Sequence, residues 1–233
     1  MCKMTLAVLC AVGLALGLAG AAQAAIVFVV SDASGNDPNV VSSTDLANSD
    51  QTTYSSIALT SGSELFASHV AKLVNGLMYG VSGGRDTDEG FSGSDGSAVT
   101  ITLDTTANTL GYDISSISTY SAYLVARRRV QNYDIAIALV GTPTTFTSLY
   151  SVSQSGSGNE YFGYRITTTQ DAGDGLLATG VSALRFTVHG GGDDVAVYRE
   201  LDVFGSATPV PEPATLALLG LGGLGMLLSR KRK

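Results

Sequence analysis

The sequence predicts an all-β fold in which two sheets pack as a sandwich. Apolar residues alternate with polar ones along several runs, as at Val99, Ile101 and Leu103, and this period of two is typical of a strand with one buried face. Stretches rich in Gly, Ser, Thr and Asp separate these runs and indicate turns. Within the body, residues 25–207, only Ser63–Val74 has a helical pattern, and it is short. Short strands at this spacing favour a two-sheet sandwich.

The expected strands follow one another through the body of the chain, residues 25–207. They are 98–104, Leu110–Thr119, Tyr133–Leu139, Phe146–Val152, Tyr161–Thr168, Leu184–His189 and Val195–Phe204. The expected turns are Ser82–Gly96, Gly141–Pro143, Ser153–Asn159, Asp171–Gly175 and Gly190–Asp194. A body of this length forms one domain and buries roughly 70% of its unfolded surface, which is enough for a core without disulfides.

The N-terminal residues 1–24 have the layout of a secretory signal peptide. Lys3 supplies a positive start, Thr5–Ala19 is apolar, and Ala22 and Ala24 are the small residues of a cleavage site. We therefore expect the export machinery to cut the chain after Ala24. An uncleaved N-terminal anchor is the alternative.

The cysteines support the same interpretation of this segment. Cys2 and Cys10 both lie in it, so the mature body contains no cysteine. Cys10 lies midway along the apolar run rather than at its end, which fits a lipoprotein anchor poorly. Disulfides, thiol catalysis and cysteine metal sites are therefore excluded for the mature body.

The C-terminal residues 208–233 combine a proline motif, an apolar segment and a basic end. The prolines keep the approach to the apolar segment extended. Residues 214–229 carry no charge and are expected to form a membrane helix, although about 20 residues are usual for a span. The basic end is expected to stay on the cytoplasmic side. The motif is Val210, Pro211, Glu212 and Pro213, and the basic stop is Arg230, Lys231, Arg232 and Lys233.

This block resembles the PEP-CTERM sorting signal in the order of its three parts. The resemblance implies that an exosortase recognises the motif, processes the chain and passes it to the cell surface or the extracellular matrix. It also implies an association with extracellular polysaccharide. Before processing, the C-terminal helix would anchor the chain in the inner membrane. A plain C-terminal anchor that is never processed is the alternative.

The body is strongly acidic. Between Ala25 and Pro213 eight Lys or Arg residues stand against twenty Asp or Glu residues, a net charge of −12. Such a surface repels nucleic acid and anionic membrane, so neither is an expected partner of the body. The acidic excess suits an exported protein that must stay soluble, and it equally suits Ca²⁺ binding.

Several segments of the body resemble discoidin-like domains, which belong to the galactose-binding-like jelly rolls. Gly180–His189 with Tyr198–Gly205 is similar to their closing strand pair, and Ala71–Gly76 to a segment that often contains Asp-Gly. Tyr133–Gly141 with Phe146–Tyr150 is similar to their central hairpin. The resemblance implies a jelly-roll sandwich. The chain departs from the family in having no Trp and in lacking the cysteine pair that often staples the domain.

The same resemblance implies a structural Ca²⁺ in some members, held by a late acidic residue and early loop oxygens. Glu200 matches the late ligand, and Asn75 occupies the early acidic position. Oxygen ligands suit Ca²⁺, but Asn in place of Asp removes one charge. The alternative is that Glu200 lies at a solvated strand edge and no cofactor is bound. The acidic run Asp86–Glu89 does not follow the EF-hand spacing and is expected to be a solvated loop.

Catalysis finds little support in the sequence. His69 and His189 are the only histidines, and neither lies in a nucleophile or zinc motif. Arg127–Arg129 suits a uronic acid or sulfate, but consecutive strand residues point to opposite faces, so a protected strand edge explains the run at least as well. We expect no catalytic residue and no enzyme.

Two functional hypotheses follow. The first is an exported, non-catalytic protein of the envelope or matrix, sorted by an exosortase and associated with exopolysaccharide. The second is a carbohydrate-binding module in which loops of the sandwich hold the ligand. The sequence alone does not identify the residues of such a ligand site.

Overall fold

The computed structural model describes residues 25–33, 41–65, 69–77, 90–122, 130–154, 163–171, 175–190 and 194–210. The signal peptide with Ala22 and Ala24, the sorting signal beyond Val210, the Asp86–Glu89 loop and Arg127–Arg129 lie outside these residues. The elements are β1 (Ile26–Ala33), β2 (Tyr54–Ser61), η1 (Val70–Val74), β3 (Phe91–Ser94), β4 (Ala98–Leu103), β5 (Tyr112–Ala122), β6 (Asn132–Leu139), β7 (Thr147–Ser153), β8 (Gly163–Gln170), β9 (Ala178–Val188), β10 (Val195–Tyr198) and β11 (Glu200–Ala207).

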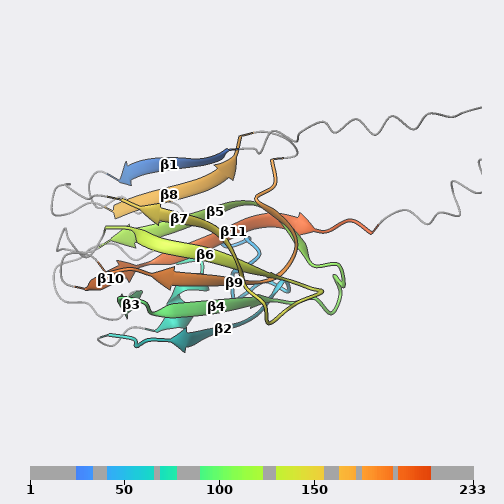
Figure 1. Ribbon diagram of the computed structural model, residues 1–233, viewed down its shortest axis with the longest axis horizontal. Coiled ribbons are helices and arrows are strands. Elements are labelled where there is room, and N and C mark those ends of the chain that lie inside the picture. The colour runs from blue at the N-terminus through green and yellow to red at the C-terminus, as the bar shows by residue number, and fades with distance from the viewer. Residues whose placement is uncertain are drawn as a thin grey trace, which may run out of the picture.

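The strands form two antiparallel layers, as the sequence predicts (Figure 1). One layer has the order β1-β8-β5-β11, and the other has the order β7-β6-β9-β4-β2. The layers join at one corner, where Tyr112 and Ile114 of β5 pair with Val181 and Ala178 of β9. Strands β3 and β10 form a separate two-stranded ribbon. The prediction of a two-sheet sandwich is confirmed.

The alternation in the sequence becomes the division between core and surface. In β4, Val99, Ile101 and Leu103 are buried between the layers, whereas Thr100 and Thr102 point outward and are partly exposed. This follows because successive side chains of a strand point to opposite faces of the sheet. The outward faces of β4 and its neighbours therefore remain available for a site.

Aromatic rings fill the centre of the core. The Tyr133 ring centroid lies 5.1 Å from that of Phe186 and 6.0 Å from that of Tyr198, and Phe186 and Tyr198 meet edge to face at 4.8 Å. At the side of the sandwich, Phe28 of β1 meets Tyr150 of β7 edge to face at 5.7 Å. Aromatic pairs prefer this geometry and each contributes about 0.5–1.5 kcal/mol beyond the burial of its area.

The expected helix over Ser63–Val74 is wrong at its start. Glu64 is extended and forms a β-bridge with Gly93, and among the described residues of this range only Val70–Val74 turns as a 3-10 helix. The Glu64 carboxylate accepts a hydrogen bond from the Val70 backbone N–H at 2.8 Å, which satisfies a donor at the start of that short helix. Pairing with the sheet therefore overrides the local pattern.

Three strands were not expected from the sequence, and the expected strand Val195–Phe204 is divided at Arg199 into β10 and β11. Strands β1 and β2 lie at sheet edges with one neighbour each, and β3 lies within the expected turn Ser82–Gly96. In β2 the burial pattern does not alternate cleanly, because its outer edge is solvated. Within the part of the chain that the structure describes, no helix is long and apolar enough to cross a membrane.

Candidate functional site

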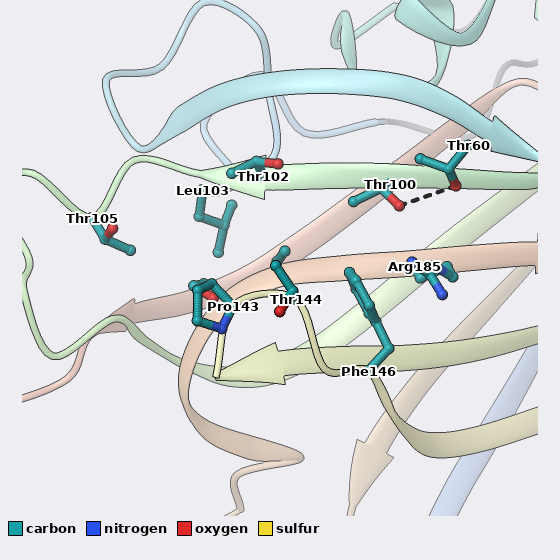
Figure 2. Close-up of a pocket in the computed structure, with 11 residues that line it drawn as sticks. Thr60, Thr100, Thr102, Leu103, Thr105, Pro143, Thr144, Phe146 and Arg185 are labelled. Carbon is teal, nitrogen blue, oxygen red and sulfur yellow. Dashed lines mark hydrogen bonds between the residues drawn. The ribbon is translucent and has the colours of Figure 1, made fainter. Parts of the chain in front are cut away.

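A groove of about 370 Å³ lies on the outer face of the layer that contains β2, β4 and β9 (Figure 2). The strands supply its floor, and the loop between β6 and β7 supplies one wall. The polar floor residues are Thr60, Thr100, Thr102, Ser182 and Arg185, and the wall residues are Pro143, Thr144 and Phe146. A volume of this size is within the range of small-ligand pockets, roughly 300–1,000 Å³.

The pairing register of the strands sets the floor of the groove. Thr100 of β4 lies opposite Arg185 of β9, and Thr102 lies opposite Ala183. The small Ala183 leaves open space beside the arginine. The Thr60 and Thr100 hydroxyl oxygens are 3.2 Å apart, and the Thr60 hydroxyl also donates to the Ala98 carbonyl at 3.1 Å (Figure 2). The hydroxyls therefore stand in a row across two strands.

Arg185 is the one cation of the groove lining. Its guanidinium carbon lies 3.8 Å from the centroid of the Phe146 ring, a cation–π contact. Its Nε is buried and makes no hydrogen bond. Arg185 forms no ion pair with any residue that the structure describes. A positive charge that is oriented but that no described residue neutralises is suited to an anionic ligand.

A second polar site lies inside the body, where the loop after β1 meets the start of β11. Asp45, Glu200 and Asp202 are all buried there. One oxygen of each carboxyl group accepts backbone hydrogen bonds: Glu200 from Gly76 at 3.1 Å, Asp202 from Ser42 at 3.0 Å, and Asp45 from Val203 at 3.0 Å. The bonds of Ser42 and Asp45 tie the loop after β1 to β11, and the bond of Gly76 ties the segment after η1 to the same strand.

The other oxygen of each of these carboxyl groups is buried without a partner. Burial raises the pKa of Glu200 to about 9 and that of Asp202 to about 7, and repulsion from the neighbouring carboxylates adds to both shifts. Burial also raises the pKa of Asp45. An unpaired charge in the interior is unfavourable, and a buried carboxylate avoids this free-energy cost by taking up a proton or by binding a cation.

These facts bear on the expected Ca²⁺ ligands Asn75 and Glu200. The two lie close together, because Gly76, next to Asn75, donates to Glu200. The Asn75 side chain, however, accepts from the Leu77 backbone N–H at 3.0 Å in a local turn. The alternative of a solvated Glu200 is wrong, since that residue is 0% exposed. The metal assignment itself stays a prediction.

The residues present suit Ca²⁺ in their chemistry. All of the available donors are oxygens, and three buried carboxyl oxygens have free lone pairs. Among the described residues, no three His, Cys, Asp or Glu side chains already converge on a metal position. Sequence reasoning missed Asp45 and Asp202, although Asp202 lies two residues from Glu200 on the same face of a strand.

The two histidines lie beside carboxyl groups. His189 Nε2 lies 2.8 Å from Asp134 Oδ2, and its Nδ1 lies 3.5 Å from Asp95 Oδ1. His69 lies 3.9 Å from Glu64. Because both ring nitrogens of His189 face carboxylates, neither is directed at a nucleophile. This arrangement joins β9, β6 and the turn after β3 at the surface.

Comparison with known sequences identifies the C-terminal block. Residues 209–233 match the PEP-CTERM protein-sorting motif, which confirms the sorting signal expected from the sequence. The motif implies exosortase-sorted export. No curated protein matches the chain in sequence.

Solved structures of carbohydrate-binding modules are similar to the body. One, from Clostridium perfringens in complex with GalNAc-β-1,3-galactose, is 12% identical, with 64% of this chain and 94% of that chain covered and a TM-score of 0.42. A chitosan-binding module from a Paenibacillus chitosanase/glucanase is 15% identical, covering 69% and 98%, with a TM-score of 0.41. A pectin-binding module is 14% identical, covering 68% and 94%, with a TM-score of 0.39.

Proposed function

We propose that this chain is an exported, non-catalytic protein of the cell envelope or extracellular matrix, which an exosortase processes and which binds extracellular polysaccharide in the outer groove. The preferred ligand is a polysaccharide that carries carboxylates. The observation that supports this ligand class most directly is Arg185, which is held against Phe146 and forms no ion pair with a described residue.

The groove provides the three kinds of contact that a sugar acid requires. The guanidinium of Arg185 matches a carboxylate through parallel hydrogen bonds. The rings of Phe146 and Pro143 offer apolar surface to the C–H face of a sugar. The hydroxyls of Thr60, Thr100 and Thr102 can donate to and accept from sugar hydroxyls.

The charge of the body makes this position selective. A body with a net charge of −12 repels a carboxylate over most of its surface. A local cation on an otherwise uncharged, threonine-rich floor therefore favours the binding of an acidic sugar in the groove. The loop residues 143–146 form only one wall of this site, so the sheet face contributes as much as the loops.

Titration calorimetry of the purified protein with a polyuronate, and with a neutral polysaccharide for comparison, tests the ligand proposal. Arg185→Gln should weaken binding of the polyuronate roughly 10- to 100-fold, because a hydrogen bond to a charged group contributes about 1.5–3 kcal/mol. Lys72→Gln, which removes one positive charge outside the groove, is the matched control and should leave affinity unchanged. Equal affinity of the wild type and Arg185→Gln would contradict the proposal.

Sorting is tested separately, by following the chain in cells. Deleting residues 211–233 should prevent C-terminal processing and retention at the cell surface, and mass spectrometry of the wild-type C-terminus should show a cut near Pro211–Pro213. An unprocessed wild-type C-terminus that still contains Arg230 and Lys233 would support a permanent anchor instead.

A structural Ca²⁺ is part of the same proposal. Glu200, with Asp202 or Asp45 and the loop around Asn75, would hold the ion. Its role would be to neutralise the buried carboxylates and to fasten the loop after β1 against β11. The groove is built from other residues, so the ion would act on the stability of the body rather than on the ligand.

A further inference from the structure

The start of strand β1 is tied to the end of strand β8 by a side chain. The backbone nitrogen of Ala25 donates to Asp171 Oδ1 at 2.9 Å, and the Asp171 backbone N–H donates to the Ala25 carbonyl at 3.2 Å. The pair continues the β1–β8 ladder by one step beyond Ile26 and Gln170. The Asp171 carboxylate therefore accepts from the nitrogen that begins the strand.

This nitrogen is the atom that the expected signal cleavage would release. The Ala22 and Ala24 pattern predicts a cut after Ala24, and such a cut converts the Ala25 amide into a free α-ammonium group. The hydrolysis adds one water across the peptide bond: the Ala24 carbonyl carbon takes the oxygen as a carboxylate, and the Ala25 nitrogen becomes protonated. A neutral donor next to Asp171 is thereby replaced by a positive charge.

We propose that Asp171 is the binding site for the mature N-terminus, so that removal of the signal peptide completes an ion pair that fastens strand β1. Asp171 is exposed and forms no ion pair with the described residues, so its carboxylate is available for this role. The proposal depends on cleavage after Ala24 and not on the ligand of the groove.

Strand β1 is an element for which such a fastening matters. It lies at the edge of its layer and pairs only with β8 among the described strands (Figure 1). Two of its apolar side chains, Phe28 and Val29, are 42% and 54% exposed. Terminal strands fray unless they are tied down. A fixed first residue keeps β1 in register, and with it the Phe28–Tyr150 contact that joins the two layers.

The first test establishes where the mature chain begins. N-terminal sequencing or mass spectrometry of the exported protein should find Ala25. A mature chain that starts at another residue, or that keeps residues 1–24, overturns the proposal.

The second test measures the ion pair directly on the mature protein. The α-amino group is reductively methylated with ¹³C-formaldehyde and a borohydride reductant, and its titration is followed by NMR in the wild type and in Asp171→Asn. An exposed ion pair should raise the pKa of the α-amino group by roughly 0.2–0.7 pH units above its value in Asp171→Asn, since such pairs contribute about 0.2–1 kcal/mol. Equal pKa values in the two proteins overturn the proposal.

A one-residue extension is the matched control. A chain that begins at Ala24 displaces the α-amino group from Asp171, so Asp171→Asn should no longer change its pKa. Asn keeps an acceptor oxygen for the Ala25 N–H and is isosteric with Asp, which preserves the fold. If Asp171→Asn fails to fold, two chains with the wild-type Asp171 are compared instead, one that begins at Ala25 and one that begins at Ala24. The chain that begins at Ala25 must show the higher α-amino pKa, and equal pKa values overturn the proposal.

Discussion

The buried carboxyl groups predict that this protein becomes less stable as the pH rises from 5 to 8 in the absence of divalent cations. The pKa of Glu200 is about 9 in the folded protein, against an ordinary value of 4.5. The folded state therefore binds this proton more tightly than the unfolded state, and the free energy of unfolding falls between those two pH values. The pKa of Asp202, about 7 against 3.8, acts in the same direction at lower pH.

The size of the effect follows from the pKa of Glu200. The free energy of unfolding is about 3 kcal/mol lower at pH 7 than at pH 4.5, because it falls by about 1.4 kcal/mol for each pH unit between the two pKa values. For a domain of this length, this corresponds to a fall in Tm of roughly 6 to 12 °C. Other groups act on Asp202: Tyr120 donates to its carboxyl group at 2.9 Å, Arg165 lowers its pKa, and Asp45 raises it.

Thermal unfolding followed by circular dichroism, from pH 5 to pH 8 in EGTA, measures the effect. Glu200→Gln keeps the group neutral at every pH, so it should flatten the pH dependence and raise Tm at pH 8. Asp50→Asn, which removes the charge of an exposed residue in the nearby loop, is the matched control and should keep the wild-type slope. Millimolar Ca²⁺ should raise Tm at pH 8 for the wild type but not for Glu200→Gln.

Two results would refute this reasoning. A wild-type Tm that stays constant or rises from pH 5 to pH 8 in EGTA would mean that the carboxyl groups ionise without cost. An identical slope in Glu200→Gln and the wild type would mean that another group is responsible. A pH dependence of the expected sign that Ca²⁺ does not change would contradict the calcium proposal alone.

The remaining predictions concern single positions. Phe146→Ala should weaken polyuronate binding several-fold in calorimetry by removing the ring that orients Arg185, and unchanged affinity would show that the ring has no part in binding. Gly76→Ala should lower the free energy of unfolding by about 1–2 kcal/mol in urea titrations, since φ is +68° and a Cβ would lie 2.4 Å from Asn48 Nδ2. Gly96 also has a positive φ, +76°, but a Cβ added there would have no atom within 4 Å, so Gly96→Ala should lower the free energy of unfolding by less than Gly76→Ala. Equal effects of the two substitutions would exclude the steric clash at Gly76 as the cause. Tyr198→Phe should cost about 1 kcal/mol through loss of the hydrogen bond to the Asn132 carbonyl, and no change in the urea midpoint would contradict this.

Local patterns in the sequence were enough to predict much of the sandwich. Period-two alternation marked β4 and β9 and also separated their inward residues from their outward ones. The pattern failed at Glu64, which a helical spacing placed in a helix but which pairs with Gly93 of β3. It also failed at the edge strand β2, where one neighbour and a solvated outer edge leave little alternation.

The candidate sites were less predictable, because their residues meet only through long-range pairing. Arg185 and Phe146 lie on different elements, and nothing near either one in the sequence indicates that the ring will cover the guanidinium. Asp45 and Glu200 come from a loop after the first strand and from the last strand. The resemblance to discoidin-like domains identified Glu200 but gave no indication that Asp45 would be buried beside it.

The sequence by itself determined the C-terminal sorting signal and the inward and outward faces of most strands, because these depend on residues that are neighbours along the chain. Only the tertiary structure decided that Ala183 and Arg185 would lie beside Thr102 and Thr100 in the floor of a groove, and that three acidic side chains would be buried in the same part of the body. Those encounters depend on which strands pair, and in which register. Strand pairing is set by burial of the whole core between the two layers rather than by any local pattern.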